Sequence, residues 1–157
     1  MKVILLVVGK TDKRYVQDAV DEYIKRLKHY VSFDLEVIPD LKNSKNITSE
    51  MHKIKEGCLI LNREFNGKEL HLFDEGGQMF TSREFASFIE KKMLSGLKEL
   101  IFVIGGPYGF STEVYEKANS KISLSKMTFS HQMARILCVE QIYRALTILK
   151  GEPYHHD

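Results

Sequence analysis

The run LIFVIGGPYG, residues Leu100–Gly109, decides which class of fold this sequence adopts. Its first five residues are apolar and rich in β-branched side chains, which is typical of a strand buried on both faces of a parallel sheet. The glycines that follow let the backbone approach a ligand closely. The loop has neither the G-x-G-x-x-G spacing of dinucleotide sites nor the G-K-[ST] ending of a phosphate loop, so by itself it fits a ligand loop or a plain tight turn equally well.

Segments of strand and helix period alternate on both sides of this run. Short apolar or alternating segments predict four more strands, at Val3–Val8, Phe33–Val37, Leu70–Phe73 and Lys121–Leu124. Apolar stripes predict helices over about residues 13–30, 51–61, 81–95, 112–119 and 131–149. We expect a turn at Gly76-Gly77 and an exposed loop over residues 40–50. The alternation predicts one α/β domain over residues 1–157, with a mainly parallel sheet that binds ligands at the carboxyl ends of its strands.

The composition is that of an ordinary globular domain, with 43% hydrophobic and 28% charged residues in a chain of 157. No apolar run is long enough to span a membrane, and Val3–Val8 lacks a cleavage site, so we expect a cytoplasmic protein. We interpret Cys58 and Cys138 as reduced core thiols, and we expect no metal site. The net charge of +2 neither demands nor excludes nucleic acid. A protein of this charge that acts on RNA would have to dimerise or dock onto a ribonucleoprotein.

The predicted last helix is apolar on more than one side, from Met133 to Leu149. A surface helix would show a single stripe, so this helix is either a central core helix or the seam of a homodimer.

Two further segments are candidates for chemistry. Ser123–Arg135 alternates small polar and apolar residues before a helix start, so its backbone would grip a planar base and sugar, or it is only a capping loop with Ser130 as N-cap. The tail Gly151–Asp157 has the position of a disordered terminus. Alternatively, its tyrosine and histidines suit stacking on a base and proton transfer.

Four motifs occur in a characteristic order: Ile104–Gly109, Leu124–Phe129 followed by His131, Glu140–Ala145, and Pro153–His155. Together they resemble the bacterial SPOUT family of large-subunit ribosomal RNA pseudouridine-N3 methyltransferases, the methyltransferase H family. The stretches Val8-Gly9-Lys10 and Glu22 to Leu27 resemble it too, so the likeness covers essentially the whole chain. Three positions depart mildly from the family pattern: Ser130 replaces a usual proline, and Phe110 and Phe73 stand where leucine is common.

The resemblance implies a parallel α/β fold whose last part, about residues 100–157, forms a deep trefoil knot that general topology rules would not predict. It implies a homodimer with the knots at the interface and S-adenosylmethionine (SAM) bound in the knot. The implied cofactor contacts are Phe73, Gly105, Leu124, Ser125, Lys126, Met127, Thr128 and Phe129. The implied substrate and catalytic residues are His131, Arg144, Tyr154 and His155.

The implied reaction is methylation of N3 of a pseudouridine (family position 1915) in 23S rRNA of assembled ribosomes. A neutral His155 or His131 would accept the N3 proton, and Arg144 would stabilise charge on the base carbonyls. Tyr154 would stack on the base. Two plainer interpretations stay open: Arg144 forms a helix ion pair with Glu140, and His131 only caps its helix. The alternative functions are a SPOUT methyltransferase acting on tRNA, a ribosome-binding factor without catalysis, and a small nucleotide- or flavin-binding domain.

Overall fold

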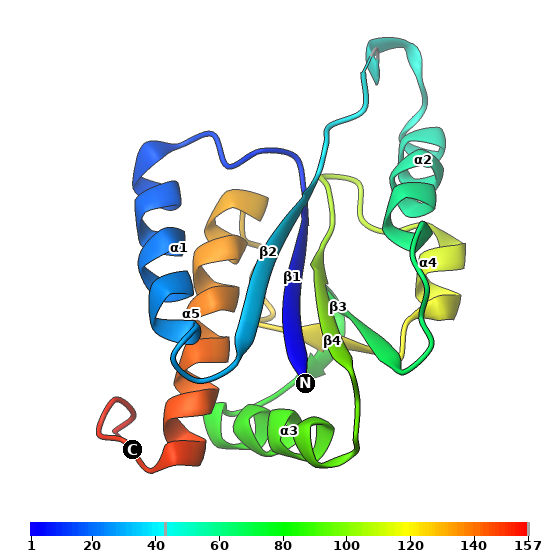
Figure 1. The fold of residues 1–157 in the computed structure, drawn as a ribbon. Coiled ribbons are helices and arrows are strands. Elements are labelled where there is room, and N and C mark those ends of the chain that lie inside the picture. Colours follow the sequence, from blue (N-terminus) through cyan, green and yellow to red (C-terminus); the bar gives the residue numbers. More distant parts are fainter. Residues whose placement is uncertain (43, 157) are drawn as a thin grey trace.

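The computed structural model describes residues 1–42 and 44–156, and its centre is a five-stranded parallel sheet (Figure 1). The strand order is β2-β1-β4-β3-β5. The elements are β1 Lys2–Val8, α1 Arg14–Leu27, β2 Ser32–Ile38, a 3-10 turn at Ser44–Asn46, α2 Ser49–Leu61, β3 Lys68–Met79, α3 Ser82–Leu94, β4 Glu99–Ile104, α4 Thr112–Lys117, β5 Ser120–Ser123 and α5 His131–Lys150. The predicted α/β class and all five predicted strands are therefore confirmed.

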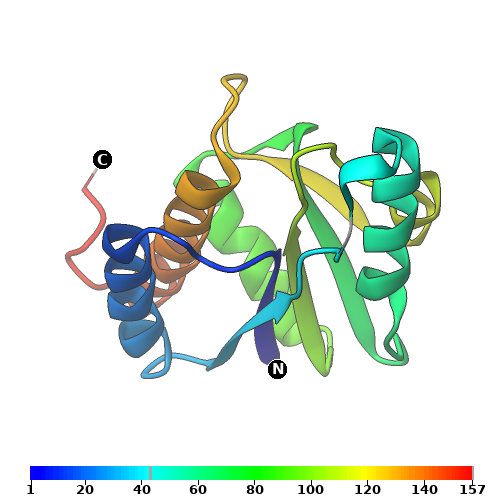
Figure 2. The same cartoon turned by 90° about the horizontal axis from the view of Figure 1, so that it is seen from above.

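Helices cover both faces of the sheet, which explains why its central strands are apolar throughout. On one face, α1, α3 and α5 pack over alternate residues of β1 and β4, among them Leu5 and Phe102. On the other face, α2 and α4 pack over the residues between them, such as Leu6 and Val103. Figure 2 shows the two helical layers on either side of the strands.

β3 is three times as long as predicted, and the turn expected at Gly76-Gly77 is instead part of this strand. The strand continues through Gly76-Gly77 to Met79, and its two halves pair with β5 on either side of a bulge, so that both Phe73 and Gln78 face Ile122. A Cβ atom at Gly77 would lie 2.5 Å from the backbone nitrogen of Ile122. The glycine is therefore needed for close approach of two strands, which has the same sequence signature as a turn.

Two smaller expectations also change. The predicted loop over 40–50 contains the 3-10 turn and the start of α2, which is capped by the Thr48 side chain, because Met51 N–H donates to it. Asn43, within that predicted loop, lies outside the described residues, as does Asp157 in the tail. Cys138 is buried as predicted. Cys58 is exposed, because it lies on the outer side of α2, in the layer that α2 forms with α4.

α5 begins and ends where the sequence predicts. Ser130 caps it by accepting from Met133 N–H, and Gly151 ends it in the left-handed conformation at φ 67°. Eight of its residues are buried, including Cys138, Ile142 and Leu146. Met133, however, is 42% exposed, and Leu137 is half-buried, so α5 is not a fully enclosed core helix. The knot over about residues 100–157 stays a prediction that rests on the resemblance.

Across residues 1–42 and 44–156, no helix is both long and apolar enough to cross a membrane. The same residues contain no group of three or more His, Cys, Asp or Glu side chains placed to hold a metal ion.

Candidate functional site

A pocket opens at the carboxyl ends of β3, β4 and β5, where ligands bind in parallel α/β sheets. Its volume is about 750 Å³. The walls are the bulged middle of β3, where its first half ends, the glycine loop after β4, and the segment that joins β5 to α5. This is within the size range of small-molecule and cofactor sites.

The pocket brings together seven of the eight residues that the sequence predicts as cofactor contacts. These are Phe73, Gly105, Leu124, Ser125, Met127, Thr128 and Phe129. Lys126 does not line it. His131, which the sequence predicts as a substrate residue, lies on the pocket wall at the first turn of α5.

The glycine loop is a tight turn that also forms a wall of the pocket, and its role as a ligand loop stays a prediction. Gly109 N–H donates to the Gly106 carbonyl at 3.3 Å, and Gly109 has a positive φ of 79°. A Cβ atom at Gly105 would lie 2.9 Å from the ring of Phe110. Glycine at 105 therefore lets the aromatic ring fold back beneath the loop.

Two carboxylates that the sequence analysis missed also line the pocket. The Tyr115 hydroxyl donates to Asp74 at 2.5 Å, and burial together with this bond raises the pKa of Tyr115 to about 12. The Thr128 hydroxyl donates to Glu75 at 2.9 Å and so ties β3 to the segment before α5. These negative charges favour a ligand that carries positive charge. The sequence signal that could have found them is their position directly after the predicted strand Leu70–Phe73.

Side-chain hydrogen bonds shape the segment between β5 and α5. Ser123 donates to the Ser125 carbonyl at 2.8 Å, and Met127 N–H donates to the Ser125 hydroxyl at 3.0 Å. Met127 and Phe129 are left 74% and 40% exposed, and Met133 in the first turn of α5 is 42% exposed. Large apolar side chains that are exposed together mark a surface that binds a partner or a ligand.

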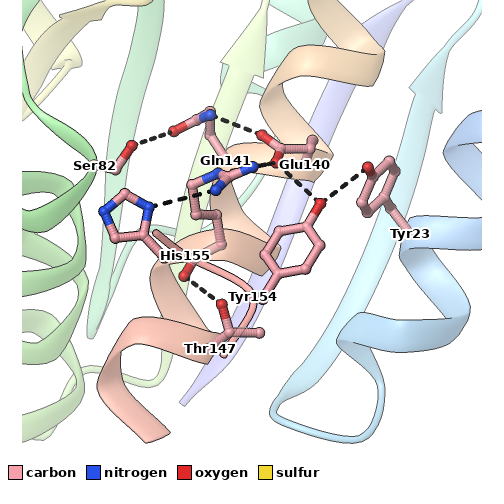
Figure 3. Close-up of polar contacts among 8 residues, drawn as sticks. Tyr23, Ser82, Glu140, Gln141, Thr147, Tyr154 and His155 are labelled. Carbon is pink, nitrogen blue, oxygen red and sulfur yellow. Dashed lines mark hydrogen bonds and ion pairs between the residues drawn. The ribbon is translucent and has the colours of Figure 1, made fainter. Parts of the chain in front are cut away.

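The tail folds back onto α5 and forms a second polar cluster (Figure 3). Arg144 donates from Nε and Nη2 to Glu140 Oε1, at 3.0 and 2.6 Å. Its Nη1 lies 3.4 Å from Nδ1 of His155. The Tyr154 hydroxyl donates to the same Glu140 oxygen at 3.1 Å and lies 3.2 Å from the Tyr23 hydroxyl. We call Tyr23, Glu140, Arg144, Tyr154 and His155 the tail cluster.

Aromatic packing holds the tail cluster in place. The ring of Tyr154 meets Tyr143 edge to face at 4.8 Å, and the Arg144 guanidinium lies 4.7 Å from the centre of the Tyr154 ring. Burial, followed by the bond to Tyr23, raises the pKa of Tyr154. The Glu140 bonds raise the pKa of Arg144. The disordered interpretation of the tail is therefore wrong for residues 152–156, and the predicted ion pair of Arg144 with Glu140 is confirmed.

The pocket and the tail cluster lie at opposite ends of α5. Arg144 follows His131 by 13 residues, which corresponds to about 20 Å along a helix. The structure thus assembles the predicted cofactor residues at one end and three predicted substrate residues at the other. It does not bring the two groups together within one chain.

A fully buried arginine, also missed by the sequence analysis, fixes the pocket end of α5. Arg135 donates to the Val8 carbonyl at 2.7 Å and to the Thr11 hydroxyl at 2.8 Å. Burial lowers its pKa. Its neighbour Gln132 donates to the Lys10 carbonyl and to Asp12. The loop after β1 is therefore anchored to the start of α5.

Comparison with known proteins agrees with this fold and pocket. The family model described as "Predicted SPOUT methyltransferase" matches residues 1–155. The chain belongs to the SPOUT methyltransferase family. It is 57% identical over 157 residues, all of both chains, to a Parabacteroides distasonis protein named Ribosomal RNA large subunit methyltransferase H. A Christiangramia forsetii protein of the same name is 56% identical over 156 residues, 99% of each chain.

A solved structure, a probable methylase family protein from Haemophilus influenzae Rd KW20, superimposes with a TM-score of 0.51. It is 12% identical, and the match covers 99% of this chain and 70% of the other. At that identity the likeness concerns the fold alone.

Proposed function

We propose that this protein transfers the methyl group of SAM to N3 of a pseudouridine in 23S rRNA of the assembled ribosome, in the cytoplasm. Membership of the SPOUT methyltransferase family and the shared name of its full-length relatives support the class of reaction and the rRNA. The observation that carries the proposal is the pocket at the carboxyl ends of β3, β4 and β5, lined by seven of the eight residues expected to contact SAM.

The pocket fits SAM in size and in chemistry. A volume of about 750 Å³ accommodates a nucleoside with an amino-acid arm. Phe73, Ile104 and Leu124 offer apolar surface to a base, and the glycine loop offers backbone groups. Asp74 and Glu75 suit the positive sulfonium and ammonium groups of SAM. SAM supplies an electrophilic methyl group on its sulfonium.

The chain's own side chains must orient the base and take up its N3 proton. His131 on the pocket wall and His155 in the tail cluster are the two candidate acceptors. Arg144 is already oriented by two bonds to Glu140, and Nη1 faces His155. A guanidinium held in this way stabilises negative charge on a base carbonyl without reorganising during the reaction. Tyr154 beside it offers a ring against which the base can stack.

We also propose that the active unit is a homodimer. A base within reach of the pocket cannot reach the tail cluster of the same chain if about 20 Å of helix separates them. Met133, Leu137, Glu140 and Arg144 follow a single outward stripe of α5 that joins the two ends. Antiparallel packing of two such stripes would bring the tail cluster of one copy to the pocket of the other. Exposed Met127 and Phe129 would be covered in the same contact.

The test is methyl transfer from labelled SAM to intact ribosomes, isolated large subunits and bulk tRNA. The ribosomes come from a strain that lacks the endogenous activity, and the product nucleoside is identified by mass. Label in ribosomes, recovered as N3-methylpseudouridine, supports the proposal. Label only in tRNA keeps the reaction class and overturns the substrate. SAM binding without transfer to any substrate favours a ribosome-binding factor without catalysis.

A further inference from the structure

A buried carboxylate lies behind the glycine loop, on the side away from the helices of the tail cluster. Glu56 on α2 is only 3% exposed. Within the described part of the chain, it is the one acidic residue that is buried. Burying a carboxylate is costly unless it is hydrogen-bonded, so its contacts indicate what it holds.

Close packing of α2 on α4 brings Glu56 to the loop. A Cβ atom at Gly57 would lie 2.5 Å from the hydroxyl of Ser111, the N-cap of α4, and 3.1 Å from Val114. Ser111 comes directly after the glycine loop and its Phe110. Because Gly57 has no side chain, α2 can pack closely against the start of α4. This packing brings the side chain of Glu56 to the backbone of the glycine loop.

Glu56 contacts the loop at Gly106. The Gly106 backbone lies against the carboxylate, because a Cβ atom at Gly106 would lie 2.6 Å from both carboxylate oxygens, and interaction with the Gly106 N–H lowers the pKa of Glu56. On its other side, Nδ1 of His52 lies 3.0 Å from Glu56 Oε1. The His52 ring packs edge to face against Tyr108 at 5.1 Å, so the pair touches the loop at two points.

The bond to Gly106 fixes the orientation of one peptide group. The described residues contain no cis peptide bond, so the N–H of Gly106 and the carbonyl of Gly105 point in opposite directions. With its N–H held by Glu56, this peptide turns the Gly105 carbonyl away from α2. Gly105 and Gly106 both line the pocket.

We infer that Glu56 is a positioning residue for the cofactor: it holds the Gly105–Gly106 peptide so that the Gly105 carbonyl is presented to SAM. This inference rests on the proposed function, because it assumes that SAM occupies the pocket. Glu56 acts from behind the loop and touches no ligand. Burial raises the pKa of Glu56 overall, and the charge of His52 and the interaction with Gly106 oppose this shift, so loss of the loop contact would raise the pKa of Glu56 further.

The first experiment measures SAM affinity by calorimetry. Removing the acceptor with Glu56→Ala frees the peptide to rotate, and we expect SAM to bind about 10-fold more weakly or worse, as for loss of a charge-assisted hydrogen bond. In Glu56→Gln the amide oxygen still accepts from Gly106 N–H, so affinity recovers to within about threefold of wild type. At saturating SAM, the rate of methyl transfer by Glu56→Ala stays within about threefold of wild type, because chemistry is untouched.

A matched control separates positioning from general stability. Glu69 at the start of β3 is a half-buried carboxylate with ion pairs to His71 and Lys92, and it lies at the opposite end of the sheet. Glu69→Ala should lower the melting temperature and leave SAM affinity unchanged. If Glu56→Ala lowered only the melting temperature, as the control does, the inference would be overturned.

A second pair of variants tests the contact itself. Gly106→Ala adds a Cβ atom that collides with Glu56, so SAM binding should weaken in the wild-type background. In the Glu56→Ala background the collision is absent, and the same change should have little further effect. Equal effects of Gly106→Ala in both backgrounds would overturn the inference. If wild-type protein bound no SAM at all, the proposed function would fail. If wild-type protein and Glu56→Ala bound SAM equally well, only this inference would fail.

Discussion

His155 and Arg144 show how far single residues can be understood from the sequence. The spacing of Glu140 and Arg144 predicts their ion pair, because residues four apart share a helix face. The contacts of Arg144 with Tyr154 and His155 depend on the chain reversing after Gly151, and nothing in the composition of the tail requires that reversal. Asp74 and Glu75 were predictable in position but not in role, because solvent-exposed loops also begin with such residues.

Replacing His155 by alanine tests its assignment as proton acceptor. Because a positioned general base contributes about 10²-fold or more, we expect the rate of a single turnover on ribosomes to fall by that factor. SAM affinity, measured by calorimetry, should stay near wild type, since His155 lies outside the pocket. Wild-type turnover in His155→Ala would remove this histidine from the mechanism and leave His131 as the acceptor.

At the scale of elements, β3 is where sequence pattern and structure differ most. Two adjacent glycines after an apolar run are typical of a turn, and only the approach of β5 reveals that they lie within a strand. Local pattern could not show this, because the pairing partner Ile122 lies over 40 residues further along the chain. The other strands were predictable because each is a short segment of apolar or of alternating apolar and polar residues that ends at glycine, proline or polar residues.

The two glycines of β3 should respond differently to substitution. In Gly77→Ala the new methyl group meets the backbone of Lys121 and Ile122 at 2.5–2.6 Å, so β5 must shift. We expect a loss of about 2 kcal/mol or more in the free energy of unfolding, measured by urea titration. Gly76→Ala is the control, since its nearest neighbour is the Asp74 side chain at 3.2 Å. Similar losses of unfolding free energy in the two variants would contradict the close approach of β3 to β5 at Gly77.

β3 also contains a histidine that makes stability depend on pH. Burial of His71, beside Phe88 and Phe102, lowers its pKa to about 4. An unfolded histidine has a pKa of about 6.5, so between these values only the unfolded chain binds the proton. Stability should therefore fall as pH is lowered through this window, by up to about 3 kcal/mol.

Urea titrations at pH 7 and pH 5 measure this effect, above the range in which Glu69 titrates. The variant His71→Gln should be less stable than wild type at pH 7, because its contacts with Ser120 and Glu69 are altered, and it should lose less stability on acidification. The same loss in both proteins would mean that another group causes the pH dependence.

At the scale of the whole molecule, the fold class and the pocket were predictable, but the separation of the site into two ends was not. The alternation of strands and helices predicts a parallel sheet, and parallel sheets bind ligands at their carboxyl ends. The distance between the pocket and the tail cluster follows from the uninterrupted length of α5, and a linear list of motifs does not display it.

The homodimer is testable by mass in solution. We expect the wild-type protein to have twice the 18.2 kDa mass of its chain at micromolar concentration. Met133→Asp places a charge on the outward stripe of α5 and should produce a monomer that still binds SAM but no longer methylates ribosomes. Met51→Asp, a similarly exposed methionine on α2 in the other layer, should remain dimeric. A monomeric wild type would exclude the shared site.

The strand order has a consequence for how the chain folds as it is synthesised. β1 is made first, yet one of its two neighbours in the sheet is β4, which begins at Glu99. At synthesis rates of about 5–20 residues per second, β1 therefore waits on the order of ten seconds for that neighbour. During this time its apolar edge and faces are open to aggregation or to a chaperone, and the many non-local pairings make the final folding step slow.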